Sequence, residues 1–204
     1  MEQQENITKK IACAIIETLC KNGIYDTTQL KVNKLTYFVY TWYCVFFGEK
    51  DFEKPKAYKK GPVFVSLRKE FGNKGYNPIF DDNLKFSMKD IDDNTLKTII
   101  ENVIKQYGRQ TARELSEKTH TKIWEDKNRS KNQTMEWKDI IEYYKNHLLE
   151  AVNIEYDSLN NVYIATSDII QGLVLESDNL GQLKKDIQEN GEEIIKLNYA
   201  TNIL

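Results

Sequence analysis

The chain has 204 residues, of which 40% are hydrophobic and 29% are charged, and its formal net charge is −2. No run of about 18 apolar residues occurs, which excludes a membrane-spanning helix. The first ten residues, MEQQENITKK, lack the apolar region of a signal peptide, so we expect a cytoplasmic protein. The odd number of cysteines, three, argues against a disulfide framework and for reduced thiols in the core.

The charge is divided unevenly along the chain. Residues 1–149 hold 26 Lys and Arg against 21 Asp and Glu, whereas residues 150–204 hold three Lys against ten Asp and Glu. The first part is therefore clearly positive and the last part clearly negative. This asymmetry predicts two modules, a main domain over 1–149 and a small acidic module over 150–204.

Apolar residues at helical spacing dominate the first fifty positions. They predict one helix over residues 7–22, ended by Gly23, and a second that begins at Thr28 and ends at Gly48. The second helix is apolar around most of its circumference, which is typical of a helix at the centre of a core. A charged connector is expected over residues 49–60.

The next segments also predict helices. Pro62 suits the first turn of a helix, because its missing N–H needs no partner there. Ser87 with Asp90, and Thr111 with Glu114, form the pattern of two capping boxes that open further helices. Residues 125–133 contain no apolar side chain and are expected to be an exposed loop, and a last helix of this part is expected from Trp137 to Leu148.

The pattern changes after residue 150. Residues 153–167 alternate between apolar and polar side chains on both sides of an Asp/Asn-rich turn, which predicts two strands, and Gly172–Glu176 predicts a third. Asp178 is expected to cap a closing helix. The predicted fold is thus a mainly α N-terminal domain followed by a small α+β module with a three-stranded antiparallel sheet and one helix.

Few groups in the chain suit catalysis or metal binding. The two histidines, His120 and His147, have no Cys or His partner at ligand spacing, and the cysteines fall among apolar residues of helices. Neither a Walker loop nor a Rossmann glycine pattern occurs. We therefore expect no enzyme activity, no metal and no cofactor. For His120 we favour a structural role, in which it caps a short helix and packs on Trp124.

A basic stretch surrounds the Gly61-Pro62 step. From Lys54 to Lys69 there are six basic residues and no acidic ones. This pattern fits an anion site at a helix start, a nucleic-acid patch, a surface for a protein partner, or a solvated rim. The sequence pI of about 5.8 argues against a nucleic-acid-binding chain, though not against a local patch.

Three ordered blocks carry a resemblance to a known family. The first runs from Lys34 to Tyr43 (KLTYFVYTWY), the second from Ala57 to Val63 (AYKKGPV), and the third from Tyr107 to Trp124 (YGRQTARELSEKTHTKIW). Together they resemble the Panacea domain, or SocA-like antitoxin domain, over roughly residues 7–148. The signature or partner-binding positions that we carry over are Lys34, Tyr37, Trp42, Lys59, Lys60, Gly61, Pro62, Val63, Tyr107, Gly108, Thr119, His120 and Trp124.

This resemblance implies a function. Panacea proteins are antitoxins of bacterial or phage toxin–antitoxin pairs that act by protein–protein contact, so the expected partner is a cognate protein toxin, and no membrane partner is expected. The tail carries, in this order, Tyr156-Asp157, Val162–Ala165, Ser167-Asp168, Gly172–Val174 and Glu176, and this set is similar to the small domain of HicB-type antitoxins. Its negative charge suits a basic toxin better than RNA. A second possible function is that of a proteolytic adaptor or a transcriptional regulator of the same operon, with a client protein, a protease or operator DNA as partner.

Overall fold

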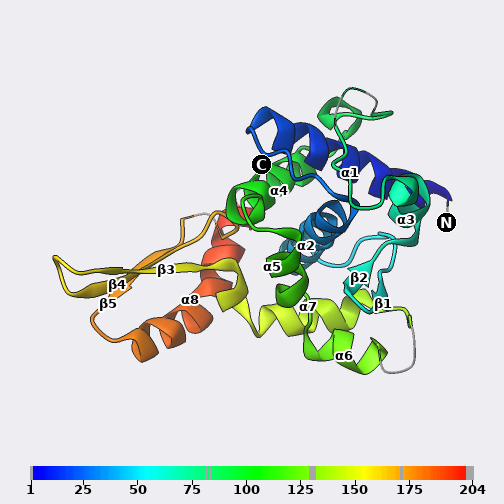
Figure 1. Cartoon of the computed structure of the whole chain (residues 1–204). Coiled ribbons are helices and arrows are strands. Elements are labelled where there is room, and N and C mark those ends of the chain that lie inside the picture. Colours follow the sequence, from blue (N-terminus) through cyan, green and yellow to red (C-terminus); the bar gives the residue numbers. More distant parts are fainter. Residues whose placement is uncertain (1, 81, 83, 129–131, 171, 201–204) are drawn as a thin grey trace.

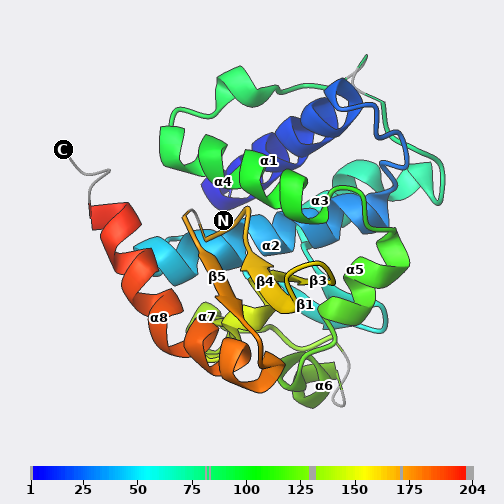
Figure 2. The same cartoon turned by 90° about the vertical axis from the view of Figure 1, so that its left-hand side faces the viewer.

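A single long helix, α2 (Gln29–Phe47), runs through the middle of the helical part of the molecule (Figures 1 and 2). In this computed structural model, which describes residues 2–80, 82, 84–128, 132–170 and 172–200, every residue from Lys31 to Trp42 is buried. The hydroxyl of Thr28 accepts a hydrogen bond from Lys31 N, and Gly48 ends the helix with φ of 86°. The central position follows from the apolar circumference of the helix.

Three helices from the first part of the chain pack around α2. They are α1 (Glu2–Lys21), α4 (Asn94–Tyr107) and α7 (Trp137–Lys145), and each of them contacts α2. Aromatic rings fill the space between them: Phe38 of α2 stacks on Tyr107 of α4 at a centroid distance of 4.5 Å, and Tyr40 of α2 meets Trp137 of α7 edge to face at 5.7 Å. The mainly α character of the first part of the chain is therefore confirmed.

Short elements connect these helices. They are α3 (Val65–Phe71), α5 (Ala112–Lys118), α6 (Lys122–Asn128) and the 3₁₀ turns η1 (Gly72–Lys74), η3 (Met88–Asp90) and η4 (Leu148–Ala151). Both predicted capping boxes are present. The box at Ser87 opens η3, whereas α4 begins later, with Asp93 as its own cap.

Two predictions for the region between residues 120 and 148 were wrong. Residues 125–128 are helical rather than loop, because Thr121 caps α6 by accepting from Trp124 N, and Trp124 packs against the core. Residues 129–131 lie outside the described part of the chain. The last helix ends at Lys145, so His147 follows it, stacked on Tyr143 at 4.0 Å.

The prediction of a helix start at Pro62 was also wrong. Strands β1 (Lys56–Tyr58) and β2 (Gly61–Val63) form an antiparallel hairpin, and α3 begins only at Val65. Proline is tolerated at position 62 because its opposite residue, Ala57, donates its N–H away from the hairpin, to Gln133 O at 2.9 Å. The hairpin therefore needs no N–H from residue 62.

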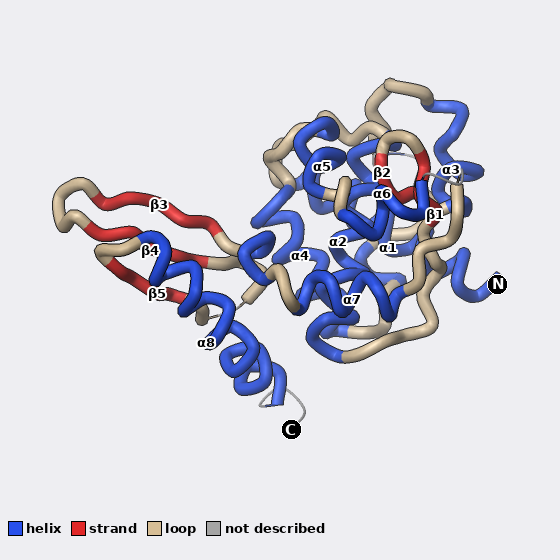
Figure 3. The backbone as a smooth tube through the Cα atoms, turned by 90° about the horizontal axis from the view of Figure 1, so that it is seen from below, coloured by secondary structure: helices blue, strands red, loops and turns tan. Residues whose placement is uncertain are grey.

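The tail forms the predicted antiparallel sheet and helix. Its strands are β3 (Asn153–Asp157), β4 (Val162–Thr166) and β5 (Val174–Ser177), in the order β3-β4-β5, and α8 (Leu180–Ala200) follows. Asn179, not Asp178, provides the side-chain cap, since its Oδ1 accepts from Gln182 N at 3.0 Å. The sheet projects from one end of the molecule (Figure 3).

The tail is joined to the helical part by specific contacts. The Tyr107 hydroxyl donates to Glu150 O at 2.9 Å, and Gln188 of α8 donates to Lys145 O at 2.9 Å. Gly191 lies so close to the buried Leu148 that a Cβ at this position would be 2.8 Å from its Cδ1. The boundary between modules at residue 150 remains a prediction. In the described part of the chain, no helix is long and apolar enough to cross a membrane.

Candidate partner-binding site

A buried lysine lies beneath the β1–β2 hairpin. Lys34 projects from α2 with no exposed surface, and its Nζ donates to Pro62 O at 2.8 Å. No described carboxylate forms an ion pair with it. Burial without such a partner lowers the pKa of Lys34 well below its ordinary value of 10.5. The lysine thus fixes the hairpin to α2 at a cost in desolvation.

Gly61 makes this close approach feasible. Its φ is +97°, and a Cβ built on it would lie 2.4 Å from Lys34 Nζ and 2.6 Å from Thr119 Oγ1. No other residue type fits a left-handed backbone with so little space. Residues from all three sequence blocks therefore lie together here: Lys34 from the first block, Gly61 from the second and Thr119 from the third.

The end of α5 closes this cluster. Thr119 is buried and its hydroxyl donates to Ser116 O, while His120 stacks on Trp124 at 3.8 Å with an interplanar angle of 11°. Trp124 Nε1 donates to Tyr58 O at 2.8 Å, which ties α6 to the hairpin. The predicted packing of His120 on Trp124 is confirmed.

The surroundings of the His120 ring favour its neutral form. Burial, and then the positive charge of Lys34, lower its pKa below the ordinary value of 6.5. Its Nε2 is buried without a hydrogen-bond partner among the described residues. A neutral ring that lies flat on an indole provides packing for the hairpin base and introduces no second charge next to Lys34.

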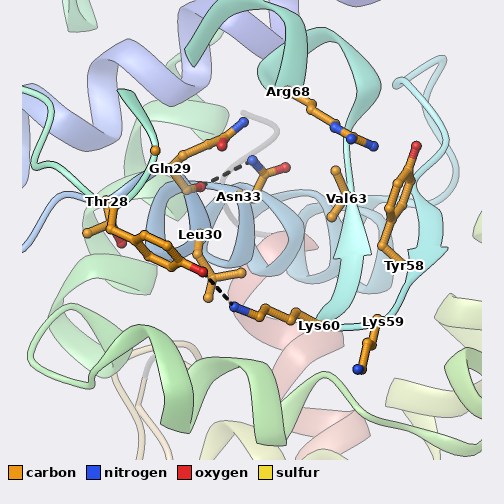
Figure 4. Close-up of a pocket in the computed structure, with 11 residues that line it drawn as sticks. Thr28, Gln29, Leu30, Asn33, Tyr58, Lys59, Lys60, Val63 and Arg68 are labelled. Atoms are coloured by element: carbon orange, nitrogen blue, oxygen red, sulfur yellow. Dashed lines mark hydrogen bonds between the residues drawn. The ribbon is translucent and has the colours of Figure 1, made fainter. Parts of the chain in front are cut away.

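The hairpin turn presents Lys59 and Lys60 to solvent, next to a groove (Figure 4). The groove has a volume of about 310 Å³, and it lies between the hairpin, the first turns of α2 and the segment around Tyr76. Its described lining residues are Thr28, Gln29, Leu30, Asn33, Tyr58, Lys59, Lys60, Val63, Arg68, Gly75 and Tyr76. None of them is acidic.

The described groove wall carries three cations. Lys59, Lys60 and Arg68 form no ion pair with any described residue. Two of them face tyrosine rings instead: Lys60 Nζ lies 5.3 Å from the Tyr76 centroid, and the Arg68 guanidinium carbon lies 5.0 Å from the Tyr58 centroid. The groove therefore combines positive charge with aromatic and aliphatic surface.

The remaining signature residues form a second cluster, inside the core. Trp42 Nε1 donates to the Tyr107 hydroxyl at 3.2 Å, and Tyr37 stacks on Trp137 at 6.4 Å. Gly108 ends α4 by donating its N–H to Ile104 O. All of these residues are buried, so they can influence a partner only through the fold.

The structure thus separates the predicted site residues by accessibility. Lys59 and Lys60 are exposed, Val63, His120 and Trp124 are half-buried, and the others are buried. Sequence reasoning missed the groove residues Leu30, Asn33, Arg68 and Tyr76, which no spacing rule connects with the hairpin. The only sequence feature that pointed to any of these four residues was the basic stretch, which includes Arg68.

The described residues offer little for catalysis. No group of three or more His, Cys, Asp or Glu among them could hold a metal ion. Burial raises the pKa of the Cys44 thiol to about 11 and also raises that of Cys13, so both thiols stay protonated and unreactive near neutral pH.

Comparison with protein families gives matches to two parts of the chain. Residues 32–125 match the family model described as "Antitoxin SocA-like, Panacea domain", which confirms the predicted Panacea resemblance over that range. The match supports an antitoxin role, and with it a toxin partner, in general terms; the Panacea domain is not a known class of enzyme. Residues 150–201 match a second model, described as a domain of unknown function (DUF1902). No curated protein and no solved structure gives a significant match to the chain.

Proposed function

We propose that this chain is an antitoxin that neutralises its cognate toxin by direct protein–protein binding, in the cytoplasm of a bacterium or of a phage-infected cell. One observation carries the proposal: Gly61, Pro62 and Thr119 meet at the buried Lys34, beneath a hairpin whose exposed basic turn lies next to a groove. The buried signature residues would then serve to position the surface that the partner touches.

The groove has the chemistry of a binding hot spot. Its apolar lining, which includes Leu30, Val63 and Tyr58, can take up one anchoring side chain, and Lys59 and Lys60 can pair with carboxylates around that anchor. Its volume of about 310 Å³ is at the lower limit for small-molecule sites, which favours a side chain as the occupant.

The tail gives the proposal a second component. We infer that it is a HicB-like module, as its sequence pattern indicates, and that its acidic surface makes a further contact with a basic toxin. The absence of basic residues from Glu150 to Leu183 supports this inference.

Co-expression with the product of the adjacent open reading frame tests the proposal. The neighbour should stop growth when it is expressed alone, and the wild-type chain should restore growth and co-purify with the neighbour. The groove variant Lys59→Glu/Lys60→Glu should bind at least about tenfold more weakly, a loss of ~1.4 kcal/mol, because two rim charges are reversed.

The matched control reverses two exposed lysines elsewhere, Lys105→Glu/Lys145→Glu, and should bind as the wild type does. Both variants should keep the wild-type melting temperature. If growth returns without a complex, direct neutralisation is wrong, and client degradation or transcriptional control becomes the better description. If both double variants bind normally, the toxin contacts another surface.

A further inference from the structure

The turn between β3 and β4 carries the most exposed large apolar side chain of the described residues. Leu159 is 93% exposed, and Tyr156, close to it on β3, is 51% exposed. Local hydrogen bonds define the turn: Asp157 Oδ1 accepts from Leu159 N at 2.9 Å, and its Oδ2 accepts from the Asn160 side chain at 2.8 Å. A turn held by its own hydrogen bonds loses less entropy when another molecule buries its leucine.

The surroundings of this turn and of the groove are opposite in charge. From Glu150 to Leu183 there are six acidic residues and no basic ones, whereas from Lys54 to Lys69 there are six basic residues and no acidic ones. Glu155 and Asp157 belong to the strand that leads into the turn, and Lys59 and Lys60 form the turn of the other hairpin. Each end thus offers an apolar element among charges of one sign.

The two ends cannot meet within one molecule. The β3–β4 turn lies at the far end of the projecting sheet, and the β1–β2 hairpin lies at the opposite end of the helical part (Figures 1 and 3). Any contact between them therefore needs a second chain. A pair related by a twofold axis forms the contact twice, whereas a head-to-tail arrangement forms it once per junction.

We propose that the chain associates with itself, and that the β3–β4 turn of one copy inserts Leu159 into the hairpin groove of another. Leu159 would lie against Leu30, Val63 and Tyr58 in the groove. Glu155 and Asp157 would face the cations that have no acidic partner within the described part of the chain, Lys59, Lys60 and Arg68. In this proposal, the occupant of the groove is the β3–β4 turn of a second copy of this chain.

The expected association is weak and sensitive to salt. One anchoring leucine with a few rim ion pairs buries far less surface than a stable dimer, so a dissociation constant of roughly 10⁻⁵ to 10⁻⁴ M is expected. Raising the ionic strength from about 0.05 to 0.5 M shortens the Debye length severalfold and should weaken the association.

This contact would also regulate the site proposed above for the toxin. A groove that holds the turn of another copy cannot hold a toxin side chain, so toxin and self-association would compete. That consequence rests on the proposed function, whereas the self-association does not, because it is measured on this chain alone.

Sedimentation equilibrium on the purified full chain provides the test. The wild-type average mass should rise above 24.0 kDa as the concentration increases from roughly 10 to 500 µM. It should approach about twice that value for a twofold pair and exceed it for a head-to-tail arrangement. Leu159→Ser removes the anchor, Lys59→Glu/Lys60→Glu reverses the groove charge, and each variant alone should stay monomeric. Val174→Ser is the matched control, since Val174 is 69% exposed and pairs with Thr166 at the opposite end of the same sheet.

Mixing the two variants gives the decisive result. The Leu159→Ser chain keeps an intact groove and the groove variant keeps an intact leucine, so an equimolar mixture should form heterodimers that neither variant forms with itself. A monomeric wild type over the whole concentration range overturns the proposal. So does association that survives both sets of substitutions, or a mixture that remains monomeric. If Leu159→Ser impairs toxin neutralisation while the wild type is monomeric, the turn contacts the toxin instead.

Discussion

Both hairpins of this molecule end in an exposed turn, but different contacts hold them. The β1–β2 hairpin is held from below by contacts from α2, α5 and α6, through Lys34, Thr119 and Trp124. The β3–β4 hairpin is shaped at its turn by its own side chains, with Asp157 as the acceptor for the turn backbone. The first hairpin depends on contacts with other elements, whereas the turn of the second depends on hydrogen bonds within the hairpin itself.

This difference explains which of the two was predictable. The β3–β4 pair was predicted from alternation and an Asp/Asn-rich turn, and the structure confirms it. The β1–β2 pair was mistaken for a connector and a helix start, because Gly61-Pro62 has the local character of a helix N-terminus. Nothing near these residues in the sequence shows that a lysine of α2 lies under them.

The largest loss of stability is expected at the base of the β1–β2 hairpin, where tertiary contacts hold it in place. Gly61→Ala should lower the free energy of unfolding by about 2–4 kcal/mol, because a Cβ at φ +97° would overlap Lys34 Nζ and Thr119 Oγ1. Urea denaturation measures this loss. Gly23→Ala is the matched control: its φ is +71° but no atom lies within 4 Å of the added Cβ, so only the backbone cost of about 1 kcal/mol applies. Equal losses for the two variants would show that the hairpin base is not tightly packed.

A smaller effect, of opposite sign, is expected at the buried lysine. Lys34→Met should stabilise the chain by about 1–2 kcal/mol near neutral pH, because methionine keeps much of the volume without the desolvated charge. The hairpin loses one hydrogen bond to Pro62 O, which offsets part of the gain.

The pH dependence of this gain follows from the lowered pKa. Between its folded-state pKa and 10.5, Lys34 binds more protons in the unfolded chain, so wild-type stability rises with pH there. The methionine variant lacks this rise, and its advantage should shrink as pH approaches 10.5. Urea denaturation of both proteins at pH 7, 8 and 9 measures the difference. An advantage that stays constant over this interval would mean that the lysine keeps its ordinary pKa.

The smallest effect is expected at the locally formed hairpin. Asp157→Ala removes the acceptor for Leu159 N and for Asn160, at a cost of roughly 1 kcal/mol. Amide hydrogen exchange should show faster opening confined to residues 153–166. Asp157→Asn retains an acceptor oxygen and should exchange nearly as the wild type does. Faster exchange in the helical part as well would contradict the local origin of this turn.

The sequence alone determined the features that depend on near neighbours. Helical periodicity and the caps at Thr28 and Thr111 predicted the main helices, alternation predicted the three-stranded sheet, and the signature blocks predicted the Panacea match. The helices, their caps and the strands depend on residues a few positions apart, and the family match depends on a sequence pattern that the family shares.

Only the tertiary structure decided where the signature residues lie. It buried Lys34 and showed that Gly61 belongs to a strand; it also joined Leu30, Arg68 and Tyr76 into one groove with the hairpin turn. The physical reason is that α2, the hairpin and α5 are far apart in the chain and meet only when the core forms. Contacts of this kind depend on how the elements pack, so they cannot be predicted from local sequence patterns.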